Sequence, residues 1–78
     1  MQYFSLSELK KGDSFVIKKI EISGSFRQRL MDIGFVPGTK VKCMRISPFG
    51  DPKAFFLRGT VIALRNCDSK NILGVKEL

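Results

Sequence analysis

The alternation of apolar and polar residues predicts short strands over most of the chain. Residues 15–22 form the first expected strand. Phe15 and Ile17 alternate there, whereas Ile20 and Ile22 alternate on the opposite parity. Because successive side chains of a strand point to opposite faces, a switch of parity within one strand predicts a β-bulge or a sharp bend. Such bends are typical of small closed barrels.

The later strands are expected between turn signals. Residues 36–39 read Val-Pro-Gly-Thr. Proline presets the first central position of a type II turn, and glycine accepts the positive φ that the second position requires. A breaker-rich loop is expected at residues 47–52, and a two-residue turn at Gly59-Thr60. The further strands are then expected at residues 40–46, 54–58, 61–65 and 72–75. In the strand at residues 40–46, alternation places Lys40 and Lys42 on one face, opposite Val41 and Cys43.

Helical patterns are short. Residues 5–12 predict one helical turn, with Ser5 and Glu8 at the spacing of a capping box. Residues 25–33 predict a helix of about two turns that ends at Gly34. The polar residues 66–71 predict one more turn. The expected apolar face of the main helix consists of Phe26, Leu30 and Ile33.

These elements predict one mostly β domain that spans residues 1–78. Five short antiparallel strands with one helix between the first and second strands indicate a small SH3-like barrel. An OB-fold is the nearest alternative, but it places its helix between the third and fourth strands. A chain of 78 residues has room for only one such domain.

Composition narrows the class of protein. The formal net charge is +7, and the lysines and arginines are dispersed along the chain. This distribution favours a solvated basic surface over a dedicated binding patch, although nucleic acid, an acidic membrane surface or an acidic protein are compatible partners. The N-terminal segment lacks the pattern of a signal peptide, and apolar runs are far shorter than the roughly 20 residues of a membrane span. Two widely spaced cysteines fit a reducing cytosol, so we expect a soluble intracellular protein.

The residues required for common catalytic and metal sites are missing. The sequence has no histidine, its cysteines lack zinc-site spacing, and its seven carboxylates are scattered. Cys43 lies in an apolar pattern, where a free thiol behaves as a small hydrophobe. We therefore expect a protein that is not an enzyme, carries no cofactor and holds no tight metal site.

Candidate binding residues occur in two segments. Phe49 is an aromatic residue at the tip of the 47–52 loop, and Asp51 follows it as a turn former. Met31 and Phe35 flank the end of the main helix, with Arg27 near them. The alternative for each apolar side chain is that it folds back onto the barrel, and Phe35 fits that alternative better than Phe49 does.

Several motifs in order resemble those of the FeoA family. Residues 30–38, LMDIGFVPG, resemble its helix-to-turn signature, a leucine followed by Gly-x-x-Pro-Gly. Leu6, Leu9 and Gly12 fit its opening Leu-x-x-Leu-x-x-Gly. Residues 48–52 resemble the central loop of the family, and residues 58–65 resemble its closing hairpin. The sequence departs from the family pattern at residues 66–71.

The resemblance implies a fold, a role and a partner. The fold is an SH3-like barrel, and the role is that of an accessory protein in bacterial ferrous iron transport. Its partner would be the cytoplasmic part of FeoB, a membrane ferrous iron transporter with a GTP-binding domain, or another small Feo component. The protein would then be cytoplasmic and would reach the inner membrane only through its partner.

Two other classes of function stay open at the level of sequence. One is a nucleic-acid-binding SH3-like or OB-like module, but Phe55 and Phe56 are adjacent and so point to opposite faces, which does not suit stacking of successive bases. We expect no specific nucleic acid partner. The other is a regulatory domain that partners an iron-dependent repressor, because a similar barrel occurs in such proteins.

Overall fold

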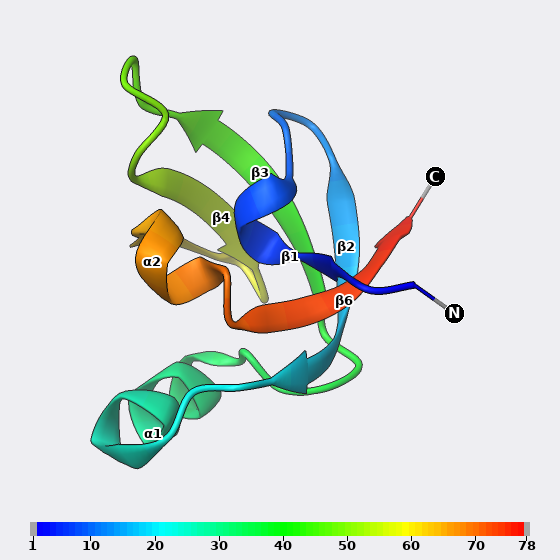
Figure 1. Ribbon diagram of the computed structural model, residues 1–78, viewed down its shortest axis with the longest axis vertical. Coiled ribbons are helices and arrows are strands. Elements are labelled where there is room, and N and C mark those ends of the chain that lie inside the picture. The colour runs from blue at the N-terminus through cyan, green and yellow to red at the C-terminus, as the bar shows by residue number, and fades with distance from the viewer. Residues whose placement is uncertain (1, 78) are drawn as a thin grey trace.

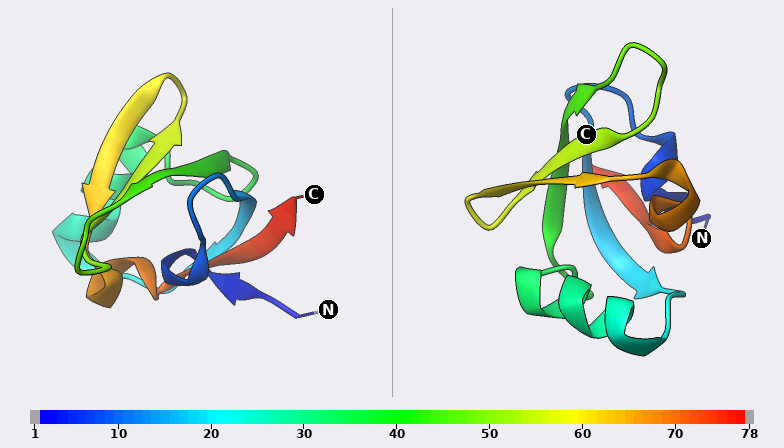
Figure 2. Two further views of the ribbon diagram at one scale, coloured as in Figure 1. Left: turned by 90° about the horizontal axis from the view of Figure 1, so that it is seen from above. Right: turned by 90° about the vertical axis from the view of Figure 1, so that its left-hand side faces the viewer.

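The computed structural model describes residues 2–77, within which six antiparallel strands form one strongly bent sheet (Figure 1). The order across the sheet is β1-β6-β2-β3-β4-β5. The sheet curls around its core when seen from above (Figure 2). The strands are β1 (Phe4–Ser5), β2 (Ser14–Ile20), β3 (Lys40–Ile46), β4 (Lys53–Leu57), β5 (Thr60–Leu64) and β6 (Ile72–Glu77).

The expected irregularity in the first long strand is confirmed. The pairing of β2 with β6 shifts register between Ile17 and Lys19, where the parity of the apolar residues changes. A second shift separates Cys43 from Arg45 in the pairing of β3 with β4. Both shifts increase the local bend, which lets one sheet curl around a single core. The strand that the sequence did not indicate is β1, whose two residues are too few to show a period.

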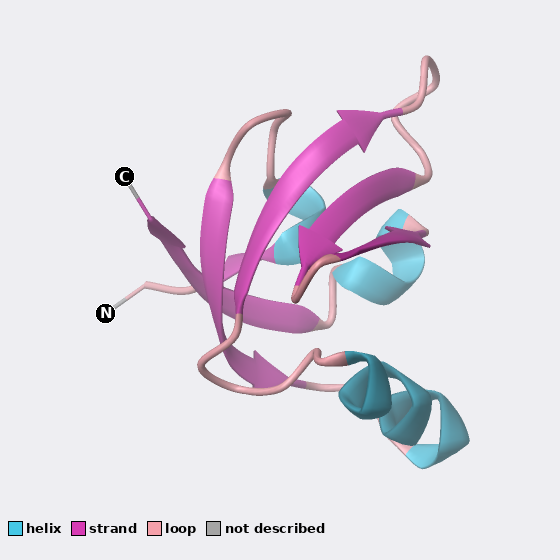
Figure 3. Cartoon of the chain, turned by 180° about the vertical axis from the view of Figure 1, so that it is seen from behind, coloured by secondary structure: helices cyan, strands magenta, loops and turns pink. Residues whose placement is uncertain are grey.

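The main helix, α1 (Gly24–Ile33), lies between β2 and β3 as predicted and projects from one end of the barrel (Figures 1 and 3). It ends in a Schellman motif: the N–H of Gly34 donates to the carbonyl of Met31, and the N–H of Phe35 donates to that of Leu30. Leu30 is buried, but Ile33 is exposed, so the predicted apolar face is shorter than expected.

The hairpin between β4 and β5 differs from the prediction by one residue. Leu57 pairs with Thr60, so Arg58 and Gly59 are the central turn residues, and both have positive φ. Positive φ at both positions is the mark of a type I′ turn. The predicted turn at Gly59-Thr60 was therefore wrong by one position. The sequence gives no sign that the arginine at residue 58 will adopt a φ of +47°.

The core lies on the concave side of the sheet and is dominated by phenyl rings and aliphatic side chains. Gly74 in β6 lets the strands approach closely, because a Cβ there would lie 2.1 Å from the carbonyl oxygen of Val16. The buried apolar residues are Leu6, Leu9, Phe15, Ile17, Ile20, Leu30, Phe35, Val41, Cys43, Phe55, Leu57, Leu64 and Ile72.

A 3₁₀ turn (Leu6–Glu8) and the short helix α2 (Asn66–Ser69) lie side by side over the open side of the bent sheet (Figures 1 and 2). The predicted capping contact is present, since the backbone N–H of Ser5 donates to the Glu8 carboxylate at 2.7 Å. The ammonium of Lys53 donates to the carbonyl of Ser7 and ties β4 to the 3₁₀ turn. No helix in residues 2–77 has the length and apolar character needed to cross a membrane.

Candidate functional site

The loop between β3 and β4, residues 47–52, is braced by hydrogen bonds at both ends. Its tip is a turn in which the N–H of Gly50 donates to the carbonyl of Ser47 at 2.8 Å. The hydroxyl of Ser47 donates to the carbonyl of Asp51, also at 2.8 Å. A loop fixed in this way loses less conformational entropy when it binds a partner.

Asp51 connects this loop to α2. Its Oδ1 accepts a hydrogen bond of 2.9 Å from the backbone N–H of Asn66, the first residue of that helix. The side-chain amide of Asn66 donates in return to the carbonyl of Gly50 at 3.1 Å. Asp51 therefore orients the loop, and its carboxylate is engaged within the molecule.

Phe49 is displayed at the tip of this braced loop. Its side chain is 96% exposed, so it does not cap the core. Exposed aromatic rings on rigid loops are typical anchors of protein interfaces. Phe49 is thus the strongest candidate for a docking residue among those that the sequence indicated.

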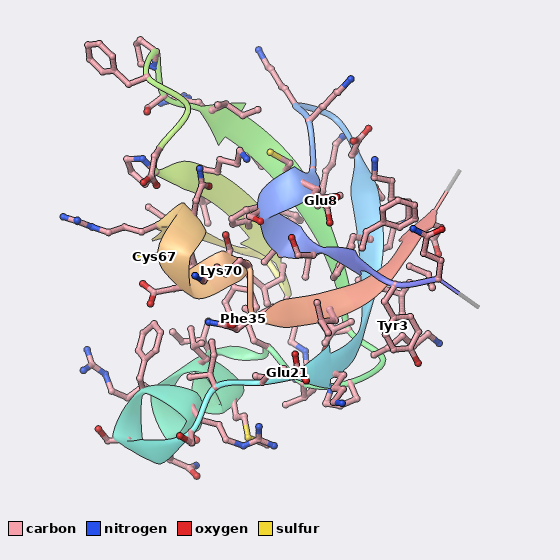
Figure 4. The ribbon with its side chains drawn as sticks, viewed as in Figure 1. Tyr3, Glu8, Glu21, Phe35, Cys67 and Lys70 are labelled. Carbon is pink, nitrogen blue, oxygen red and sulfur yellow. The ribbon has the colours of Figure 1, made fainter. Side chains whose placement is uncertain are left out.

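The candidates within α1 and directly after it occupy different environments. Phe35 is fully buried between the sheet and α1 (Figure 4), so it belongs to the core and not to an accessible surface. Arg27 donates from Nη1 to the carbonyls of Ile20 at 3.0 Å and Ile22 at 3.2 Å, which fastens α1 to the end of β2. Met31 is half-buried.

The two candidate segments do not form one site. The β3–β4 loop lies at the top of the molecule in Figure 1 and α1 at the bottom, and the right-hand view of Figure 2 shows the same separation. A partner contacting Phe49 would therefore have to extend along the barrel to reach Met31.

The two thiols lie in different environments. Cys43 is buried, and desolvation raises the pKa of its thiol, while the positive charge of Lys53 acts in the opposite direction. A buried thiol whose pKa is raised stays protonated at neutral pH and is a poor nucleophile. Cys67 lies on α2 at the surface (Figure 4).

We predict that ferrous iron does not bind tightly to the monomer. Among residues 2–77, no three side chains of histidine, cysteine, aspartate or glutamate come together. Fewer ligands leave a divalent iron site weak, and imidazole is missing altogether. Anaerobic calorimetry with ferrous iron is the test, and a stoichiometric site of micromolar affinity in the monomer would contradict the prediction.

One surface feature was missed by reasoning from the sequence. A cleft of about 360 Å³ on the outer face of the sheet is lined by Ser14, Lys40, Lys42, Phe56, Leu57 and Arg58. Alternation in β3 did place Lys40 and Lys42 on one face, opposite Val41 and Cys43, as the structure confirms. Only the register between strands brings Phe56 beside them.

The molecule is thus a small bent-sheet domain of the SH3-like class, whose notable features are a displayed aromatic loop and a basic cleft. Its sequence matches the FeoA domain model over residues 4–76, and the chain belongs to the FeoA family. The fold prediction is confirmed in class, with six strands in place of five.

Relatives of known sequence and structure agree with this family assignment. The chain is 36% identical over 67 residues to the Fe(2+) transport protein A/Fe(2+) transporter FeoB fusion protein of Porphyromonas gingivalis, a match that covers 86% of the chain and 8% of that much longer protein. The structure of the FeoA-like protein from Clostridium acetobutylicum is 31% identical in sequence with a TM-score of 0.88. This match covers 100% of the present chain and 91% of the Clostridium chain. The FeoA of Stenotrophomonas maltophilia complexed with zinc, described as a prokaryotic SH3 domain protein, is 27% identical with a TM-score of 0.80; the match covers 95% of each chain.

A manganese-dependent transcriptional repressor also contains this fold. It is 13% identical with a TM-score of 0.83, and the match covers 99% of this chain and 38% of the repressor. At that identity the likeness concerns the fold alone.

Proposed function

We propose that this protein is a cytoplasmic accessory component of ferrous iron transport that acts by docking on the cytoplasmic part of a FeoB-type transporter. The observation that carries the proposal is the exposed ring of Phe49 on a loop braced by Ser47, Asp51 and Asn66. The fusion in Porphyromonas gingivalis supports the choice of partner, because it holds both modules in one chain. Linking two modules raises their effective concentration for each other, which is useful where they must meet.

The proposed mechanism is binding without chemistry. The candidate residues provide contact area and orientation, and none of them belongs to a catalytic arrangement. The loop is ordered before the partner arrives, so association would cost little additional ordering. Another small Feo component remains a second partner to test by the same experiment.

We predict that Phe49→Ala weakens association with FeoB by about 1–3 kcal/mol, which corresponds to about 5- to 150-fold in the dissociation constant. The thermal midpoint should stay at that of the wild type, since the ring is 96% exposed. The measurement is recovery of the tagged protein with FeoB from solubilised membranes of cells grown with scarce iron, followed by titration with the purified cytoplasmic domain of FeoB.

Tyr3→Ala provides a matched control, because Tyr3 is an exposed aromatic residue outside the loop. Loss of binding in both variants would point to a general effect of aromatic removal. Undiminished recovery of Phe49→Ala would remove the loop from the interface and shift attention to the surface around Arg27 and Met31.

A further inference from the structure

The basic cleft on the outer face of the sheet has the composition of a binding site. Register aligns Ser14 of β2 with Lys42 of β3, Lys42 with Phe56 of β4, and Phe56 with Val61 of β5. These residues form a continuous row across the strands on the face opposite the core. Phe56 is 40% exposed and Val61 56% exposed, so the row has an apolar half that solvent reaches.

The other half of the cleft carries an excess of positive charge. Lys40, Lys42 and Arg58 line it together. Lys40 forms an ion pair of 2.8 Å with the carboxylate of Glu77, whereas none of the ion pairs formed within residues 2–77 includes Lys42 or Arg58. Unneutralised cations in a concave surface attract an anionic group more strongly than dispersed cations do.

Arg58 is held in place by its surroundings. Its backbone adopts φ +47°, which is unusual for a residue other than glycine. Its side chain lies against Gly34, where an added Cβ would be 2.8 Å from Cδ of Arg58. Its Nη2 also lies 3.3 Å from the hydroxyl oxygen of Thr39, to which it donates. Residues held in sparsely populated backbone conformations concentrate at functional sites.

The chain itself places one carboxylate at the border of the cleft. Glu77 of β6 pairs in register with Ser14, at the border of the cleft, and there its carboxylate engages Lys40. A carboxylate supplied by another protein would meet Lys42 and Arg58 in the same way. An apolar side chain next to that carboxylate would then cover Phe56 and Val61.

We propose that this cleft binds an acidic segment of a protein partner, with carboxylates on Lys42 and Arg58 and an apolar side chain on Phe56. The inference rests on the proposed function only in that the protein acts by docking. The cleft lies at the start of β3 and the end of β4, whereas the Phe49 loop joins the opposite ends of these two strands. The protein therefore has two separate contact surfaces, and Glu77 competes for one of them.

The experiment is an NMR titration of the full chain with a synthetic acidic peptide that contains alternating glutamates and leucines, and with a control peptide in which glutamine replaces each glutamate. We expect chemical-shift changes at the cleft residues with the acidic peptide alone, and weaker binding at higher salt. Lys42→Glu should weaken binding roughly tenfold. Glu77→Gln should strengthen it about threefold, because it releases Lys40 from an exposed ion pair.

Lys70→Glu is the matched control, since it makes the same change of net charge at the C-cap of α2, outside the cleft (Figure 4). Equal weakening by Lys42→Glu and Lys70→Glu would overturn the proposal, because net charge alone would then explain the binding. Saturation of the cleft by ATP or inorganic phosphate, with no binding of the acidic peptide, would overturn it in favour of a phosphate ligand. Phe49→Ala should bind the peptide as the wild type does, so this test and the FeoB test can fail independently.

Discussion

Gly74→Ala is expected to lower the free energy of unfolding by about 3 kcal/mol or more, at the upper end of the range for overpacked interiors. A Cβ at this position would lie 2.1 Å from the carbonyl oxygen of Val16 and 2.7 Å from Cζ of Phe15. The strand has little freedom to move away, because β6 pairs with β1 on one side and with β2 on the other. Relief would require separation of strands around a buried ring.

In a domain of this size, the loss of stability should lower the thermal midpoint by about 12–24 °C. The measurement is thermal unfolding monitored by circular dichroism. Gly12→Ala is the control. It removes a glycine with φ +94° in open space, and should cost only the roughly 1–2 kcal/mol of a left-handed backbone. A Gly74→Ala variant that melts within a few degrees of the wild type would mean that β6 can shift, and that the close approach of β6 to β2 is not required.

Phe35→Ala is expected to lower the free energy of unfolding by about 3–5 kcal/mol, the usual cost of removing a buried phenyl ring. Its ring is fully buried, and its position directly after Gly34 is the one whose side chain contacts Leu30 in a Schellman motif. Since small domains are stable by only about 5–15 kcal/mol, a large fraction of this variant should be unfolded at moderate denaturant concentrations.

The measurement is urea denaturation of Phe35→Ala beside Phe49→Ala, which removes the same side chain from a fully accessible loop. The two variants should differ by several kcal/mol in stability. A Phe35→Ala protein with the denaturation midpoint of the wild type but without affinity for FeoB would return Phe35 to the binding surface. Phe35→Leu keeps an apolar side chain at the position and should recover part of the lost stability.

The positions of Phe35 and Phe49 show how far local reasoning extends. Gly34 identified the end of α1, and the same glycine predicts that the residue after it folds back onto the helix, so the burial of Phe35 had a local signal. The local signal for the exposure of Phe49 was weaker, because a turn of proline and glycine predicts a loop but not the direction in which the ring points. The bracing of that loop by Asn66 joins residues 15 and 16 positions apart and had no local signal at all.

The cleft also shows which features local reasoning predicts and which it misses. Alternation in β3 placed Lys40 and Lys42 on the outer face, and this was confirmed. The turn at Arg58 and Gly59 was displaced by one residue from the prediction, and the type I′ turn sets the pairing of Phe56 with Val61. A site formed by cross-strand neighbours depends on register, and an error of one residue moves side chains to the opposite face.

By itself, the sequence determined the class of the domain, the order of its main elements, the bulge in β2 and the lack of histidine-based chemistry, because these depend on local periodicity, turn residues and composition. Tertiary structure alone decided that the ring of Phe49 is exposed, that Asp51 caps α2, and that Gly74 must remain without a side chain. It also decided that lysines from β3 meet an arginine from a distant turn. The physical reason is that burial, register and side-chain charge contacts arise between segments far apart in the chain, where the local pattern contains no information about distance.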